Sequence, residues 1–172
     1  GPEPGNASYY YSMTRLPTRG TVTVDGETIP VKGEAWLDRE WSTSALGPDL
    51  AGWDWFALQL GDGRELMFYR LRRKDGAADP WSRGSLVAAD GTSRSLAATE
   101  VGLEVLSTWR SPTGATYPAN WRLTVPGEAL DLVLTPRVAG QELAVTVRYW
   151  EGAVEVAGTS RGTPISGHGF VE

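Results

Sequence analysis

Residues 33–41 carry the densest group of side chains that could do acid–base chemistry. Read as a strand, this segment places Trp36, Asp38 and Glu40 on one face and Leu37, Arg39 and Trp41 on the other. Two carboxylates this close repel each other when both are ionised, and burial favours the protonated form of one of them. A carboxyl group that stays protonated near neutral pH can act as a general acid. In the simpler interpretation, Asp38 and Glu40 are solvated and Arg39 pairs with a neighbouring side chain.

A second unusual segment, residues 52–60, places an acid between two tryptophans in an otherwise apolar run. Asp54 stands between Trp53 and Trp55. Because burying an unpaired carboxylate costs several kcal/mol, we expect Asp54 to face a cationic partner. The candidate partners are three arginines, Arg39, Arg70 and Arg72. Such a pair can contribute to a binding site, or it can be purely structural.

The other candidate residues lie near the end of the sequence and include its one histidine. Tyr149 and Glu151 flank a tryptophan, and His168 lies between two glycines. Any histidine-dependent triad or metal site would depend on His168 alone, and a lone histidine in this setting more often packs or faces solvent. The sequence contains no calcium-loop, phosphate-loop, nucleotide-binding or nucleophile-elbow pattern. We therefore expect neither a metal nor another cofactor.

Short strands joined by glycine-containing turns must position these residues. Asp25-Gly26 separates the alternating runs 21–24 and 27–32, as a two-residue hairpin turn requires. A second hairpin is predicted at 54–60 and 65–72 around the turn 61–63, and Asp90-Gly91 marks a third turn. Further strands are predicted at 117–125, 130–135, 142–149 and 150–156. Helical turns are expected only at 45–51 and 96–101.

About ten strands at spacings of about 8–12 residues are typical of a β-sandwich or barrel. No repeat or linker divides the chain, so we predict one all-β domain over residues 1–172. We expect a closed antiparallel barrel of about eight to ten strands, which has room inside for side chains and one small ligand. The eight tryptophans then form rigid apolar walls for a ligand or, in the simpler interpretation, parts of the core.

The composition argues against several classes of protein. Charged residues make up 22% of the chain, the net charge is −5, and both signs are scattered, whereas a nucleic-acid binder would show a basic face. No apolar run approaches the ~18 residues of a membrane span, and no signal peptide opens the sequence. The absence of cysteine excludes disulfides and thiolate metal sites.

Several segments, in this order, resemble the second domain of the carotenoid hydratase/AttH-like family. The most specific are residues 52–56, GWDWF, and residues 149–152, YWEG. Supporting matches lie at 9–16, 36–40, 66–71, 117–118 and 167–172. The resemblance covers nearly the whole chain and implies a lipocalin-like barrel whose partner is an N-terminal lipocalin-like domain. It also suggests an exported or periplasmic protein in bacteria.

The resemblance further implies an enzyme that adds water to a double bond of an isoprenoid or another lipophilic substrate, as carotenoid 1,2-hydratases do. On this hypothesis Asp38 supplies the proton, assisted by Glu40, and Tyr69 or Glu151 holds the water. The faces of Trp41, Trp53 and Trp55 would stabilise the resulting cation. The substrate-binding residues implied by the matching motifs are Trp36, Arg39, Trp41, Trp53, Asp54, Trp55, Arg70, Tyr149, Glu151 and His168.

One departure from the family pattern favours other functions. Arg39 stands where hydratase-like members usually carry histidine, which puts a histidine-assisted proton transfer in doubt. A non-catalytic binding domain for a lipophilic small molecule needs only the barrel and the tryptophans. A structural cap that completes the site of a partner domain needs no pocket of its own.

Overall fold

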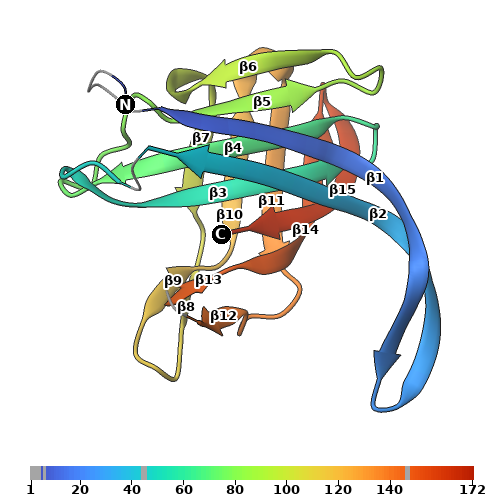
Figure 1. Ribbon diagram of the computed structural model, residues 1–172. Helices are drawn as coiled ribbons and strands as arrows, with labels where there is room; N and C mark the ends of the chain where they lie inside the picture. Colours follow the sequence, from blue (N-terminus) through green and yellow to red (C-terminus); the bar gives the residue numbers. More distant parts are fainter. Residues whose placement is uncertain (1–4, 6, 44–45, 146–147) are drawn as a thin grey trace. The chain divides into compact units, whose positions relative to one another are not determined.

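A computed structural model describes residues 5, 7–43, 46–145 and 148–172 as an all-β protein (Figure 1). This part of the chain forms fifteen strands and two single turns of 3-10 helix, which confirms the predicted class. The chain divides into two compact units, Gly1–Gly47 and Pro48–Glu172. Within the described ranges, no helix is long and apolar enough to cross a membrane.

The smaller unit is a long antiparallel hairpin of strands β1 (Ser8–Val24) and β2 (Glu27–Ser42). At its turn, Asp25 and Gly26 have φ values of 50° and 84°, which a two-residue hairpin turn requires. The predicted hairpin is therefore confirmed, and its strands are longer than expected. Residues 33–41 continue β2, so Asp38 and Glu40 lie on the half of the hairpin that is distant from the turn.

A β-bulge between Met13 and Leu16 decides which residues of the hairpin share a face. Two residues of β1, Thr14 and Arg15, lie opposite the single residue Trp36, so the alternation in β1 shifts by one position. One face of the hairpin is consequently mostly apolar and carries Tyr9, Tyr11, Met13, Leu16, Val22, Val24, Ile29, Val31, Leu37 and Trp41, together with the polar residues Thr18, Glu27 and Arg39. The opposite face carries most of the charged groups and hydroxyls.

The larger unit is built on one nine-stranded antiparallel sheet. Its strands, in spatial order, are β6 (Ser93–Ala97), β5 (Arg83–Val87), β4 (Glu65–Arg73), β3 (Leu50–Leu60), β15 (Thr163–Val171), β14 (Gly152–Ser160), β11 (Leu130–Pro136), β10 (Trp121–Val125) and β7 (Gly102–Val105). In Figure 1, β3 to β6 cross the view, whereas β10 and β11 run steeply behind them. The sheet therefore curls back over its own core.

The expected closure of this sheet into a barrel is wrong. The sheet is a curled half-barrel whose edge strands, β6 and β7, are not joined by a ladder in the described part of the chain. The residues between them form the 3-10 turn η1 (Ala98–Glu100) instead of a hairpin turn. Glu100 accepts a hydrogen bond from the Ala97 backbone N–H and another from Arg94, and these contacts stabilise the turn.

Two small strand pairs extend from the sheet: β8 (Thr108–Arg110) with β9 (Thr116–Pro118), and β12 (Glu142–Ala144) with β13 (Arg148–Trp150). The strand predicted at 117–125 is interrupted, because β9 ends at Pro118 and β10 begins at Trp121. The helical turn predicted at 96–101 is present as η1, and a second one, η2 (Pro126–Glu128), was not expected. Leu50 and Ala51 begin β3, so they do not form the helical turn predicted at 45–51; residues 45 and 146–147 lie outside the described residues.

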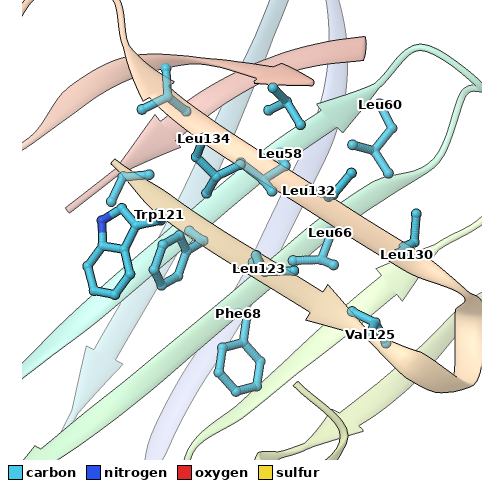
Figure 2. Close-up of a cluster of buried hydrophobic side chains, with 14 of the residues drawn as sticks. Leu58, Leu60, Leu66, Phe68, Trp121, Leu123, Val125, Leu130, Leu132 and Leu134 are labelled. Carbon is cyan, nitrogen blue, oxygen red and sulfur yellow. The ribbon is translucent and has the colours of Figure 1, made fainter. Parts of the chain in front are cut away.

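The core lies on the concave side of the sheet and consists mostly of leucines from alternating positions (Figure 2). The predicted alternation in 130–135 is confirmed, since Leu130, Leu132 and Leu134 are buried whereas Val133 is exposed. Phe56 of β3 meets Trp121 of β10 edge to face, with ring centroids 5.2 Å apart. Strands from both ends of the curled sheet therefore meet in one core.

Replacing Leu132 with alanine should lower the free energy of unfolding by about 2–5 kcal/mol, because the side chain is fully buried and its removal leaves a cavity. Urea denaturation followed by tryptophan fluorescence measures the change. Val133→Ala, at the neighbouring exposed position, is the matched control and should cost far less. Equal losses in the two variants would contradict the assigned register of β11.

Candidate functional site

Asp38 lies on the polar face of β2, where two donors contact its carboxyl group. Trp36 Nε1 donates to Oδ2 at 2.8 Å, and Ser12 Oγ, directly across the ladder in β1, donates to Oδ1 at 2.5 Å. Glu40 shares this face, and its Oε1 accepts a hydrogen bond from Ser8 Oγ. Asp38 is half-buried and Glu40 is exposed. The two carboxyl groups are thus held separately, each by its own serine.

The serine hydroxyl allows Asp38 to keep this geometry in either protonation state. An ionised Asp38 accepts hydrogen bonds from both neighbours. A protonated Asp38 can donate from Oδ1 to Ser12 Oγ, since a hydroxyl also accepts, while Oδ2 still accepts from the Trp36 indole. The arrangement can therefore hold a proton on one defined carboxyl oxygen.

Arg39 and Trp41 lie on the opposite face of β2 from Asp38. The Arg39 guanidinium carbon is 5.7 Å from the centroid of the Trp41 ring, a cation–π distance. Trp41 also stacks on Tyr9 at 5.7 Å and meets Tyr11 edge-on at 6.4 Å. These residues form an aromatic cluster, and Trp41 cannot share a strand face with Asp38.

Asp54 lies on the core side of β3 and is only 4% exposed. Its register partner on β4 is Arg70, which donates to Oδ2 from Nε at 2.9 Å and approaches the same oxygen with Nη2 at 2.8 Å. Arg72 Nε lies 3.5 Å from Oδ1. The Arg70 guanidinium carbon is also 5.1 Å from the centroid of the Trp121 ring. Two of the three candidate arginines therefore contact Asp54.

Trp53, Trp55 and Tyr69 lie on the other side of this sheet from Asp54. Trp55 pairs with Tyr69 across the β3–β4 ladder, and both are half-buried, whereas Trp53 is exposed. The Tyr69 hydroxyl donates to the backbone carbonyl of Trp81 at 3.3 Å. Because side chains alternate along a strand, Asp54 and its flanking tryptophans cannot line the same surface of the sheet.

The last three candidates lie on strands at the C-terminal end of the chain. Tyr149 belongs to β13 and Glu151 follows this strand; burial, reinforced by the charges of Glu151 and Glu172, raises the pKa of the Tyr149 hydroxyl. His168 is exposed on β15 and pairs with Gln59 of β3. In the part of the chain that the structure describes, no three His, Cys, Asp or Glu side chains gather as metal ligands would.

The sequence interpretation missed a cluster around Glu142, which joins the two small strand pairs. Its carboxylate accepts hydrogen bonds from Ser111 Oγ at 2.5 Å, Thr113 Oγ1 at 3.0 Å and Tyr117 Oη at 2.8 Å. Arg148 Nε lies 4.0 Å from Oε1. The bond from Ser111, with those from Tyr117 and Thr113, lowers the pKa of Glu142 against the opposing effect of desolvation. About thirty residues of sequence separate the hydroxyl donors from the Glu142 carboxylate, so no local motif could reveal this cluster.

This lowered pKa predicts how the stability of the β8–β9 and β12–β13 pairs depends on pH. A carboxyl group whose pKa is lower in the folded state stabilises the fold above its unfolded pKa, about 4.3 for Glu, and this contribution is lost as the pH falls through the folded value. Thermal unfolding of the wild type and Glu142→Gln from pH 7 to pH 3 tests this. The wild type should have the higher Tm near neutrality, and the difference should shrink on acidification; a constant difference would contradict it.

The larger unit also contains a polar hollow of about 400 Å³ at the ends of several turns. Its charged lining residues are Asp62, Arg64, Arg94, Glu128 and Arg161, and Leu86 and Ala88 contribute apolar surface. Arg64 Nη2 donates to Asp62 at 2.7 Å and to Ser160 at 2.6 Å, and Glu128 accepts from Arg94 Nε at 2.9 Å. These internal ion pairs mark a structural network rather than the apolar pocket expected from the sequence.

Comparison with known proteins gives relatives that share this fold. Kievitone hydratase from Fusarium solani subsp. phaseoli is 25% identical over 173 residues, covering 96% of this chain and 48% of that protein. The crystal structure of a protein described as AttH, from Nitrosomonas europaea, superimposes with a TM-score of 0.87 at 40% identity, covering 99% of this chain and 53% of that one. Kievitone hydratase from Nectria haematococca, at 23% identity and a TM-score of 0.77, shares the fold over 95% of this chain and 52% of its own.

The chain thus spans about half the length of each of these relatives. The resemblance inferred from GWDWF and YWEG is confirmed over the full sequence, since the family model for AttH-like proteins matches residues 1–172. The chain therefore belongs to the AttH-like family.

Proposed function

We propose that this chain is a hydratase-like domain that adds water to a carbon–carbon double bond of a lipophilic, isoprenoid-like substrate. The observation that carries the proposal is the position of the Asp38 carboxyl group, held between Trp36 Nε1 and Ser12 Oγ on the polar face of β2. Membership of the AttH-like family and the similarity to kievitone hydratase support a hydration reaction.

The reaction begins when Asp38 transfers its proton to one alkene carbon, and the π electrons form the new C–H bond. The neighbouring carbon becomes a tertiary cation. Among the aromatic side chains of the hairpin, Trp36 and Tyr10 lie on the same face as Asp38. We therefore assign the cation–π contact that stabilises this cation to Trp36 and Tyr10, and not to Trp41. Water then forms a C–O bond with the cation, and Glu40, on the same face, accepts the proton that the water loses.

Arg39 does not weaken this proposal, although the family resemblance implies histidine at this position. Its side chain lies on the opposite face of β2, against Trp41. The hydrogen bonds of Asp38 come from Trp36 and Ser12, so the identity of residue 39 leaves them unchanged. The roles of Tyr69 and Glu151 in holding water stay predictions. A second lipocalin-like domain, expected from the half-length match to the relatives, is the proposed partner of this chain.

One observation favours a second candidate, a non-catalytic binding domain for a lipophilic small molecule. The same two neighbours hold Asp38 in place when it is ionised, since both then donate to it, and an ionised carboxylate cannot protonate an alkene. A domain of this kind would bind its ligand and release it unchanged.

Incubation with a panel of acyclic and prenylated isoprenoids, followed by mass spectrometry, separates these candidates. A product heavier by one water molecule, formed from some panel members and absent without protein, is the result expected of a hydratase. Saturable quenching of tryptophan fluorescence without any change in ligand mass would support the binding domain. The absence of both product and quenching would contradict both candidates.

A further inference from the structure

One arginine of the polar hollow, Arg161, takes no part in the ion pairs that line it. Asp62 accepts a hydrogen bond from Arg64 at 2.7 Å. Glu128 accepts one from Arg94 at 2.9 Å. In the part of the chain that the structure describes, neither a carboxylate nor a neutral acceptor contacts the Arg161 side chain. Each acid of the lining is therefore matched by one arginine, and the third guanidinium group keeps its donors for a ligand.

The paired charges form fixed walls of the hollow. The Arg64 side chain is 14% exposed, and Glu128 lies 3.9 Å from its Nη1. Arg94 also donates to Glu100 at 2.8 Å, and this third acid is not among the residues that line the hollow. Both arginines are thus held in place by acids, so the charge that faces the hollow without a partner is that of Arg161.

The backbone of Arg161 has a conformation that arginine rarely adopts. Arg161 and Gly162 form the two-residue turn between β14 and β15, with φ values of 51° and 77°. Such a turn favours asparagine, aspartate or glycine at its first position, because these residues tolerate the left-handed conformation best. An unfavourable residue in an otherwise ordinary turn points to a role for its side chain.

Contacts on both sides of Arg161 fix the position of this turn. The backbone N–H of Arg161 donates to the Ala129 carbonyl at 2.9 Å, directly after η2. The preceding residue, Ser160, accepts a hydrogen bond from Arg64 Nη2 at 2.6 Å. The Arg161 side chain therefore starts from a fixed point at the rim of the hollow.

The remaining lining suits a small molecule that is not wholly polar. The hollow of about 400 Å³ falls within the range of small-molecule sites, about 300–1,000 Å³. Leu86 and Ala88 contribute apolar surface, and Thr92 and Ser93 contribute hydroxyl groups. A guanidinium group presents a planar fork of N–H donors, which matches two oxygens of a carboxylate or a phosphate. This combination fits an oxyanion that carries a short apolar group.

We propose that the hollow binds a small organic oxyanion, a carboxylate or a phosphate ester, through the Arg161 guanidinium group, with the apolar part of the ligand against Leu86 and Ala88. The site lies wholly within the unit Pro48–Glu172 and is independent of the hydration proposed for Asp38. An oxyanion makes charge-assisted hydrogen bonds with the guanidinium group, whereas a neutral ligand of the same shape does not pair with its charge.

Isothermal titration calorimetry of this chain with benzoate, phenyl phosphate and neutral benzamide tests the inference at pH 7.5 and low ionic strength. At least one of the two anions should bind at least about tenfold more tightly than benzamide, because only the anions pair with the guanidinium charge. The tighter anion identifies the head group as carboxylate or phosphate. Equal affinities for the three compounds, or binding by none of them, would overturn the inference.

The variant Arg161→Asn separates ligand binding from a structural role of this arginine. Asparagine tolerates the left-handed conformation, so the variant should unfold at the same or a higher temperature than the wild type, yet lose the preference for the anion. A preference that persists in this variant would overturn the inference. A marked loss of thermal stability would also overturn it, because Arg161 would then serve the fold.

The control is Arg110→Gln, which removes the same charge from another part of the larger unit. Arg110 is exposed on β8, forms no ion pair within the described ranges and does not line the hollow. This variant should keep the full preference for the anion. An equal loss of preference in Arg110→Gln would show an effect of net charge alone and would contradict a site at Arg161.

Discussion

Replacing Asp38 with asparagine should lower the rate of water addition about 100- to 10,000-fold, the usual contribution of a general acid. The asparagine side chain can still accept the hydrogen bond from Trp36 Nε1 and donate one to Ser12 Oγ, so the local geometry should persist. Only the transferable proton is lost. The value of kcat for a substrate identified by mass spectrometry gives the effect directly.

The control for this variant is Glu34→Gln on the same face of β2. Glu34 is a carboxylate of the same hairpin, but its partner is Arg15, at 2.5 Å, and it lies on the side of Trp36 away from Asp38. The rate of water addition by Glu34→Gln should stay within about twofold of the wild-type rate, since surface substitutions away from a site have small effects. An Asp38→Asn variant as active as this control would exclude Asp38 as the acid.

Replacing Asp54 with alanine should lower the free energy of unfolding by about 3–5 kcal/mol, because it leaves the Arg70 charge without its partner at the edge of the core. Chemical denaturation measured by fluorescence and circular dichroism gives the loss. Asp131→Ala is the matched control: Asp131 also pairs with an arginine, Arg122, at 2.6 Å, but both side chains are well exposed.

The control should lose much less stability than Asp54→Ala, because water solvates the arginine that remains after the substitution. Comparable losses in the two variants would mean that Arg70 is solvated in the folded protein.

Local features of the fold could be predicted from the sequence where short-range physics decides them. Asp25-Gly26 favours a two-residue turn whatever surrounds it, and the alternation of Leu130, Leu132 and Leu134 fixes one buried face. Burial costs also predicted that Asp54 needs an arginine, and the choice among three candidates was decided by the β3–β4 register.

Features that depend on distant pairing could not be read from the sequence. The bulge at Met13 and Leu16 changes the face of every later residue in β1, and no local signal marks it. The contact of Ser12 with Asp38 joins residues 26 positions apart. Closure of the barrel was expected from the number of strands and from the family resemblance, whereas the chain forms a 3-10 turn between the edge strands, in which Glu100 accepts a hydrogen bond from the Ala97 N–H.

The central claim, that Asp38 initiates hydration by protonating a double bond, is tested most directly by running the reaction in D₂O enriched in ¹⁸O. The account predicts a product with one deuterium on the protonated carbon and one ¹⁸O on the adjacent carbon, formed by the wild type and not by Asp38→Asn. A product lacking either label, or equal labelling by the two proteins, would contradict it.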